Sequence, residues 1–437
     1  MGIQQHLLAI GASGPKGFIA TLYKSSTEFS PYALPGLCKP DASGNIPVIA
    51  SIALSSGFTA GFHAKLTSTG SLIASENFYR SASEDYFAQI GGILPSGYLL
   101  STSTVSDTYT GLVLTTGSGI SAQIRTNTPG TSLPSNVAVA PDGTNYVMHQ
   151  FFATSSTLQF GKFTSALGVS WWGRLTNATP TWYATPSFID ADNSACYIAG
   201  SYDDSASSSV GVVVKVTNAG SLSWQRTLKV GTSYTSGVTC CVDNSGNVYL
   251  VVYQATSTIY LAKYNSSGTL QWQKSIVLAS SILQPAAVVA DSALNVYLLC
   301  VNGSGALTLI KLNSSGALQW ARSISVGASF SVSSSALRLG VTSSDNVLVQ
   351  YRMLGPTNNG LVTLSLPSDG SGTGTYTNPI RDITYAAVST VTVCPLLTVT
   401  LAVAGGISPD EPLQLGASTP ACHTPLTLFS QVLALDH

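Results

Sequence analysis

Residues 190–194, which read Asp-Ala-Asp-Asn-Ser, place oxygen-bearing side chains at alternate positions. Such spacing can bring several oxygens onto one hard cation, as the binding loop of an EF-hand does with calcium. The pattern then departs from that loop, because Ala195 stands where the turn glycine belongs and Ser201 where a bidentate glutamate belongs. A hairpin turn is the better interpretation, and we expect no metal site.

Two short motifs match fragments of penicillin-interacting serine enzymes, Ser13-Gly-Pro-Lys16 and Ser344-Asp345-Asn346. That chemistry needs the serine and lysine one turn apart on a helix, which Gly-Pro between them prevents. The five histidines show no H-E-x-x-H spacing, and the sequence has no G-x-S-x-G elbow. A Ser-His-Asp triad is defined by geometry in space, and nothing in the spacing points to one. We expect no catalytic residues and no cofactor site.

The seven cysteines are few for a chain of 437 residues, and an odd number leaves at least one unpaired. Cys240 and Cys241 are adjacent, so on a strand they point to opposite faces and cannot chelate one metal. The sequence therefore predicts small buried thiols and no disulfide framework.

Charge excludes two classes of partner. Charged residues make up 8% of the chain, and 18 Lys and Arg face 19 Asp and Glu. There is no basic field to bind a nucleic acid and no polybasic segment to hold an anionic membrane. With 44% hydrophobic residues the chain can still bury a large core.

Targeting signals are equally absent from the pattern. The first ten residues lack a basic region and offer a short apolar run, which predicts a protein that is not exported by the Sec route. The uncharged stretch 383–409 contains proline, two glycines and many β-branched residues, so we expect strands there and no membrane span.

Four segments of the chain repeat a common pattern: ALGVSWWGRL, AGSLSWQRTL, SGTLQWQKSI and SGALQWARSI. Each reads Gly-x-x-x-Trp, and the steps between successive tryptophans are 52, 48 and 48 residues. A period of this size is typical of a propeller blade. The pattern assigns structural, blade-packing roles to Gly168, Gly220, Gly268, Gly316, Trp172, Trp224, Trp272 and Trp320.

Apolar runs precede each repeat glycine, and polar tips separate the first two of these runs. We therefore expect three or four short strands per unit. The tips contain Asp142, Asp192, Asp243, Asp291 and Asp345. Aspartate suits such turns because it tolerates the left-handed conformation or bonds its own backbone.

Weaker copies extend the series in both directions, with markers at 26, 70, 119, 168, 220, 268, 316 and 370. They predict an all-β chain, a single β-propeller with eight blades favoured. Seven is the alternative if the N-terminal copy only completes the last blade. We expect strands from the N- and C-terminal parts to close the ring, with residues near 383–393 completing the blade begun by residues 6–30. The propeller then covers 1–393, and 394–437 form an extension of strands and loop packed on the ring.

The run Asn313-Ser-Ser-Gly-Ala-Leu-Gln-Trp320 resembles the tryptophan-docking repeat of propellers related to the pyrroloquinoline-quinone dehydrogenases and of bacterial cell-surface propellers. The resemblance covers residues 130–325. It implies that the tryptophans pack between neighbouring blades, and it implies a fold without an activity. A quinoprotein enzyme is not expected, because the chain shows no acidic cluster and no secretory signal.

The composition, rich in Ser, Thr and Gly and poor in charge, is similar to that of bacteriophage tail and virion proteins. We expect a non-catalytic virion structural or tail-associated protein, with host-surface glycan as a candidate ligand. Its partners would be other virion proteins or copies of itself, and it would reach the virion from the host cytoplasm. The alternative is a bacterial propeller scaffold or carbohydrate-binding protein, and a third reading is a propeller hydrolase or lyase.

Overall fold

The computed structural model confirms the all-β class, since every element in the part of the chain that it describes is a strand. The described residues are 4–10, 17–23, 36–41, 43–53, 59–78, 91–93, 99–105, 109–116, 119–127, 132–151, 157–164, 169–176, 182–204, 208–228, 235–254, 258–278, 282–302, 305–326, 331–332, 337–354, 360–376, 382–388, 391–395 and 427–430. No helix among them is long and apolar enough to cross a membrane.

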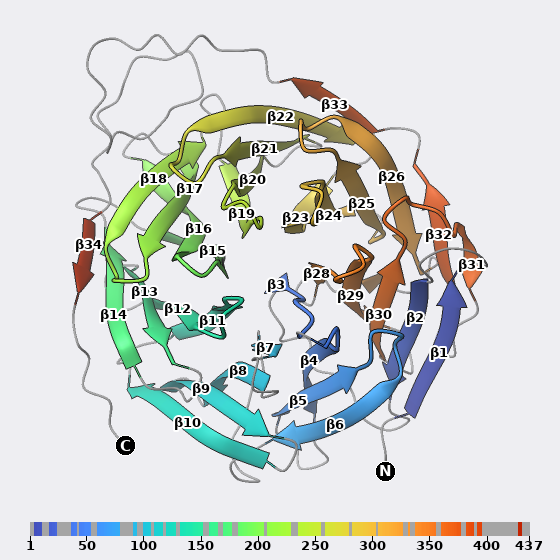
Figure 1. Cartoon of the computed structure of the whole chain (residues 1–437), viewed down its shortest axis with the longest axis horizontal. Coiled ribbons are helices and arrows are strands. Elements are labelled where there is room, and N and C mark those ends of the chain that lie inside the picture. The colour runs from blue at the N-terminus through green and yellow to red at the C-terminus, as the bar shows by residue number, and fades with distance from the viewer. Residues whose placement is uncertain are drawn as a thin grey trace.

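The described strands form seven sheets, labelled A to G here, arranged around a common centre (Figure 1). Sheet A contains β28 (Arg338–Val341), β29 (Val347–Leu354), β30 (Gly360–Leu366), β2 (Gly17–Tyr23) and β1 (Gln4–Ile10), with β3 (Gly36–Leu37) beside β28 and β27 (Ser331–Val332) beside β29. Sheet B contains β4 (Ile46–Ala53), β5 (Thr59–Leu66) and β6 (Leu72–Phe78). Sheet C contains β7 (Gly91–Ile93), β8 (Leu99–Val105), β9 (Tyr109–Thr116) and β10 (Gly119–Asn127).

The remaining four sheets follow in chain order. Sheet D contains β11 (Ser132–Val139), β12 (Asn145–Phe151), β13 (Thr157–Phe163), β14 (Val169–Thr176) and β34 (Thr427–Ser430). Sheet E contains β15 (Trp182–Ala191), β16 (Ala195–Asp204), β17 (Ser208–Thr217) and β18 (Leu222–Leu228). Sheet F contains β19 (Thr235–Val242), β20 (Val248–Gln254), β21 (Thr258–Tyr264), β22 (Leu270–Leu278) and β33 (Val391–Pro395). Sheet G contains β23 (Ile282–Ala290), β24 (Val296–Asn302), β25 (Leu307–Leu312), β26 (Leu318–Ser325), β32 (Ile383–Ala387) and β31 (Gly374–Tyr376).

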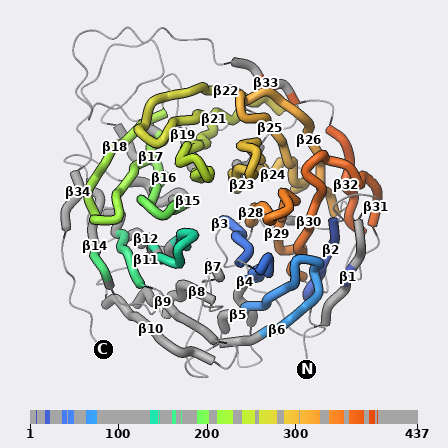
Figure 2. The backbone as a smooth tube through the Cα atoms, in the orientation of Figure 1, coloured from blue at the N-terminus to red at the C-terminus, as the bar shows by residue number. Residues whose placement is uncertain are grey.

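Each sheet contains a run of three or four consecutive antiparallel strands, arranged in order from the centre outward. In sheets D to G the first strand lies innermost and the fourth lies near the rim (Figures 1 and 2). Strand β24 reads Val-Tyr-Leu-Leu-Cys-Val-Asn, and its first six residues are buried. A continuous apolar run of this kind is expected where a strand is covered on both faces, as it is when sheets stack face to face around a centre.

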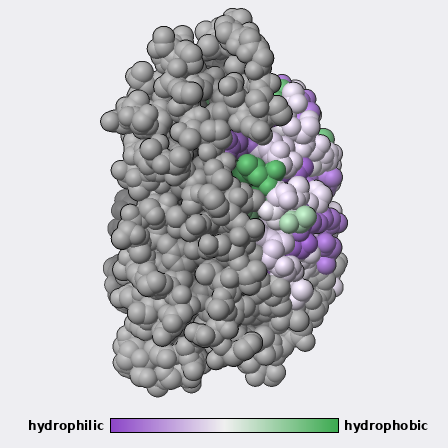
Figure 3. Space-filling view, turned by 90° about the vertical axis from the view of Figure 1, so that its left-hand side faces the viewer, coloured by the Kyte–Doolittle hydropathy of each residue, from purple (hydrophilic) through white to green (hydrophobic). Residues whose placement is uncertain are grey.

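Five hydrophobic clusters lie between neighbouring sheets. They join sheets A and B, D and E, E and F, F and G, and G and A. At the junction of F and G, for example, Tyr249 and Leu261 pack against a cluster that includes Leu298 and Ile310. The surface on the side shown in Figure 3 is mostly hydrophilic to neutral where its residues are described. Apolar burial between sheets is therefore the main stabilising term of the array.

The turns between the first two strands follow the sequence prediction for aspartate. Asp243 accepts hydrogen bonds from the backbone N–H groups of Ser245 and Asn247, each at 2.9 Å. Gly246 follows in the left-handed region at φ 75°. Asp345 takes that left-handed position itself, at φ 61°. Aspartate serves this turn in both ways that its chemistry allows.

The N-terminal strands join the sheet formed by the last repeat. All seven residues of β1 pair with β2, and β2 pairs antiparallel with β30, from Phe18 opposite Ser365 to Tyr23 opposite Gly360. The N-terminal copy does not begin a sheet of its own in the described residues. The described residues therefore form seven sheets, whereas the sequence favoured eight blades. The difference arises because β2 pairs with the edge of β30 and does not start a separate sheet.

The C-terminal strands are placed differently from the sequence prediction. Strand β32 pairs with β26 on the outer edge of sheet G, and β33 pairs with β22 on the outer edge of sheet F. The prediction that residues 383–393 complete the blade begun by residues 6–30 is wrong for the described residues. Strand β2 is already paired with β1 on one side and β30 on the other, so the later strands β32 and β33 extend the exposed edges of other sheets. Most of the extension 394–437 lies outside the described residues.

Candidate functional site

A cavity of about 750 Å³ lies where the first turns of several sheets meet near the centre. Its wall is formed by the turns of sheets D, E, F, G and A, together with Leu37 and Lys39 from β3 and the segment after it. Each of these turns is short and polar because it must reverse the chain between two buried strands. The cavity therefore collects the polar tips of an otherwise apolar array.

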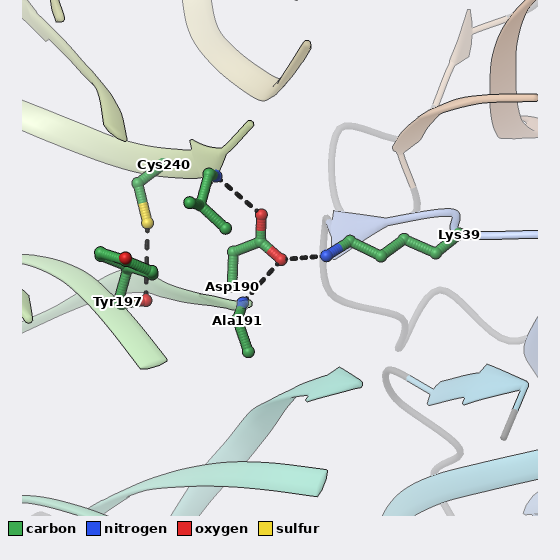
Figure 4. A network of polar contacts seen from close by, with 6 residues as sticks. Lys39, Asp190, Ala191, Tyr197 and Cys240 are labelled. Carbon is green, nitrogen blue, oxygen red and sulfur yellow. Dashed lines mark hydrogen bonds and ion pairs between the residues drawn. The ribbon is translucent and has the colours of Figure 1, made fainter. Parts of the chain in front are cut away.

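Lys39 and Asp190, which both line this cavity, form an ion pair (Figure 4). Asp190 lies near the end of β15, and its side chain is 1% exposed. Its Oδ1 accepts hydrogen bonds from Lys39 Nζ and from the backbone N–H of Ala191, the latter at 2.8 Å. Its Oδ2 accepts the backbone N–H of Val242 at 2.9 Å. One buried carboxylate thus connects sheet E, sheet F and the segment that follows β3.

Two further aspartates in the wall are saturated by their own turns. Asp243 accepts the Nδ2 group of Asn247 at 2.8 Å and the hydroxyl of Tyr249 at 3.0 Å, besides its backbone donors. Asp291 makes the same pair of side-chain contacts, with Asn295 and Tyr297. These carboxylates hold turns in shape, so they are not available as general bases.

Asp192 is also held within its turn. Burial raises the pKa of this carboxyl, but hydrogen bonds from Ser194 and Tyr197 outweigh burial and leave the pKa below its usual value. The Tyr197 hydroxyl donates to Oδ2 at 2.7 Å. Asp192 is therefore ionised at neutral pH and serves as an acceptor, which is the opposite of what a general acid requires.

The remaining charges of the wall bind across neighbouring elements. Lys215 Nζ donates to the carbonyl of Ser266 at 2.9 Å. Asp345 accepts the backbone N–H of Ser292 at 3.1 Å and its hydroxyl at 2.7 Å, which joins the turns of sheets G and A. Every charged side chain in the wall thus has an intramolecular partner, and the described residues contain no group of three His, Cys, Asp or Glu that could hold a metal.

Burial makes the cysteines of the described chain unreactive. Cys38, Cys196, Cys240, Cys241 and Cys300 are all free and buried. Burial raises the pKa of the Cys38 thiol to about 12, although Arg338 opposes the shift, and it raises the pKa of Cys240 and Cys241 as well. Since the thiolate is the nucleophile, none of these cysteines can act as one.

We expect a disulfide reagent such as dithionitrobenzoate to titrate at most two thiols in the native protein. The two would be Cys394 and Cys422, whose side chains lie outside the described residues. All seven thiols should react in guanidinium chloride, because unfolding exposes them and restores their ordinary pKa. More than two fast-reacting thiols in the native protein would contradict the burial of the other five.

The predicted repeat tryptophans lie at junctions between sheets. Trp224 is 5% exposed, whereas Trp272 and Trp320 are partly buried. The indole N–H groups of these three donate to the backbone carbonyls of Ser266, Ser314 and Ser368 in the next sheet, at 3.0 to 3.1 Å.

In the first repeat the equivalent residue is Trp171 and not Trp172. Trp171 pairs with Lys162, as Trp224 pairs with Lys215, and its indole N–H donates to the carbonyl of Asn218 at 2.8 Å. The register assigns Trp172 to the position opposite Gly161. In this copy the packing position therefore belongs to Trp171, one residue before the predicted Trp172.

The repeat glycines accommodate these indoles. Gly220, Gly268 and Gly316 adopt positive φ of 77° to 80°. A Cβ at Gly268 would stand 2.9 Å from Trp224 Cδ2, and one at Gly220 would stand 3.1 Å from Trp171 Cδ2. Gly168 lies outside the described residues.

Sequence reasoning missed the contact between Lys39 and Asp190. One signal was present, because residues 41–45 repeat the Asp-x-Ser-Gly-Asn turn of residues 243–247. Aligning the two turns places Lys39 at the register of Cys241 on an innermost segment. The pairing with Asp190 depends on which sheets face each other, which the local pattern does not contain.

Comparison with known proteins gives structural likeness alone. No family model and no curated protein matches the chain. An oligogalacturonate lyase in complex with manganese matches at 9% identity and a TM-score of 0.48, over 84% of this chain and 97% of its own. The polysaccharide lyase Uly1 matches at 7% and 0.49, over 77% and 91%. The β-propeller domain of the Trilobed protease from Pyrococcus furiosus matches at 10% and 0.46, over 76% and 95%. These likenesses are too distant to bear on what the chain binds or does.

Proposed function

We propose that this chain is a non-catalytic component of a bacteriophage particle that presents a binding face for host-surface glycan. The observation that carries the non-catalytic part is the state of the cavity wall. Asp190, Asp192, Asp243, Asp291 and Asp345 all accept hydrogen bonds from within the protein. Catalytic acids and bases need a proton to exchange with a substrate, whereas these groups are occupied in holding turns and sheets together.

We further propose that the seven sheets are the blades of a closed β-propeller. Support comes from β2, which pairs with β30 and so joins the beginning of the chain to the last repeat. It also comes from the indole contact between sheets G and A, where Trp320 Nε1 donates to the carbonyl of Ser368. A closed ring leaves each sheet with a neighbour on both faces and removes exposed inner edges.

The particle setting rests on composition. A chain with 8% charged residues and a net charge of −1 has a surface dominated by neutral hydrogen-bonding groups. Such a surface suits close packing against neighbouring copies or other particle proteins, because few charges must be desolvated on contact. It also suits recognition of glycans by shape and hydrogen bonding.

The test is the location and the inertness of the protein. We expect it to copurify at a fixed copy number with intact phage particles through density-gradient centrifugation. We also expect the purified chain to release no new reducing ends or unsaturated products from host polysaccharide. A protein found free in the cytosol and absent from particles would refute the particle role, and turnover of polysaccharide would refute the non-catalytic role.

A further inference from the structure

We propose that the mouth of the central cavity is a binding site for a neutral, polyhydroxylated sugar. This inference rests on the glycan-binding part of the proposed function and assigns it a place. A volume of about 750 Å³ falls within the range of about 300–1,000 Å³ typical of small-ligand sites. A pyranose ring combines apolar C–H faces with hydroxyl groups around its edge, and the cavity offers a counterpart to each.

The floor of the site is aliphatic. Leu37, Val242, Val289 and Val341 all line the cavity and are half-buried, and the three valines also pack against the clusters between sheets. They lie at or near the ends of four different inner strands, β3, β19, β23 and β28. Contact with the C–H face of a sugar would remove this apolar surface from water, which is favourable at about 25 cal/mol per Å².

The rim of the site carries polar side chains that are free to bind a ligand. Asn244 and Ser343 are exposed tips of the first turns of sheets F and A, and both line the cavity. Among the described residues neither side chain has an intramolecular hydrogen-bond partner, unlike the aspartates beside them. An amide and a hydroxyl can both donate and accept, which is what the hydroxyl groups of a sugar require.

The charge of the wall selects the class of sugar. Lys39 and Lys215 are its two cations, and the five aspartates leave a formal charge of −3. Both lysines are already bound to oxygen acceptors of the protein. A uronic or sialic acid would therefore bring a carboxylate into a negative environment without a free cation to receive it, and like charges brought together are strongly unfavourable.

The experiment compares two surfaces of the same protein. The intact chain is applied to an array of neutral oligosaccharides of glucose, galactose, mannose and rhamnose, beside matched oligosaccharides that contain uronic or sialic acid. The best neutral binder is then titrated by calorimetry into wild type, the rim variant Asn244→Ala/Ser343→Ala, and the control Ser223→Ala. Ser223 is exposed on β18, outside the cavity wall. All three proteins should keep one melting temperature, since none of the replaced side chains is buried.

We expect binding of neutral oligosaccharides that weakens about tenfold in the rim variant and is unchanged in Ser223→Ala, because two hydrogen bonds are lost in the first. Equal affinity of the rim variant would overturn the site and leave the glycan-binding function standing. Preference for the acidic oligosaccharides would overturn the class of sugar. No binding at millimolar concentrations, by a protein that still copurifies with particles, would overturn the inference and leave the structural role.

Discussion

Replacement of Trp224 by alanine should lower the free energy of unfolding by about 3–5 kcal/mol, the range found when large aromatic side chains are removed from a core. Trp224 is 5% exposed, and its indole N–H donates to the carbonyl of Ser266 at 3.1 Å. Its ring lies 6.3 Å from that of Tyr197 and 6.4 Å from that of Tyr264. The glycine at position 268 leaves room for it in the next sheet. The substitution therefore opens a void at the junction of sheets E and F, which denaturant unfolding would report.

Two variants separate the causes of that loss. Trp224→Phe keeps most of the apolar area and removes the N–H donor to Ser266, so we expect a smaller loss of about 1–2 kcal/mol. Ser223→Ala changes the adjacent exposed residue of β18 and should be close to neutral. If Trp224→Ala unfolds at the wild-type midpoint, the indole does not stabilise the junction, and sheets E and F are held by the aliphatic cluster alone.

Deletion of residues 1–25 should convert the protein into an aggregating species. The deletion removes β1 and β2, which leaves the edge of β30 without its partner. It also removes Phe18, Ala20 and Leu22 from the cluster between sheets A and B. An unpaired edge beside exposed apolar surface is a template for association with other chains. Light scattering after size-exclusion chromatography would detect the oligomers.

A shorter deletion serves as the control. Removing residues 1–12 takes away β1 and keeps β2 on β30. That variant should keep the oligomeric state of the wild type and lose little stability, because β1 is an edge strand with Leu7 already 43% exposed. An equally stable deletion of 1–25 that does not aggregate would show that β2 is an appended arm and not part of the packed array.

The sequence predicted the turns and the repeat tryptophans of this fold, because short stretches of neighbouring residues determine them. The Asp-x-Ser-Gly-Asn turn at 243–247 could be recognised because aspartate bonds the backbone two and four residues ahead. Trp224, Trp272 and Trp320 could be found because a 48-residue period repeats them. In the first repeat the tryptophan was assigned one residue too far along, because it was counted from the glycine. The left-handed position of a turn does not require glycine, since Leu294 adopts it at φ 63°. Anchoring on Lys162 would have selected Trp171.

Long-range choices could not be predicted in this way. Whether residues 17–23 begin a sheet or extend one depends on the edge that β30 presents, and β30 lies far later in the chain. Likewise Lys39 and Asp190 share nothing in local sequence, and only the arrangement of sheets around a centre brings them together. The candidate site was therefore the part least accessible to sequence reasoning, since its residues come from several different repeats.

The pairing of β2 with β30 also sets a schedule for biosynthesis. Ser365, the partner of Phe18, is synthesised long after Phe18 itself. At about 5–20 residues per second, the nascent strand waits on the order of tens of seconds for its neighbour. During that interval the first four strands of each of sheets D to G can pair as they are translated, since those four strands are consecutive in the chain. Strand β2 is thus secured in its sheet long after its own synthesis.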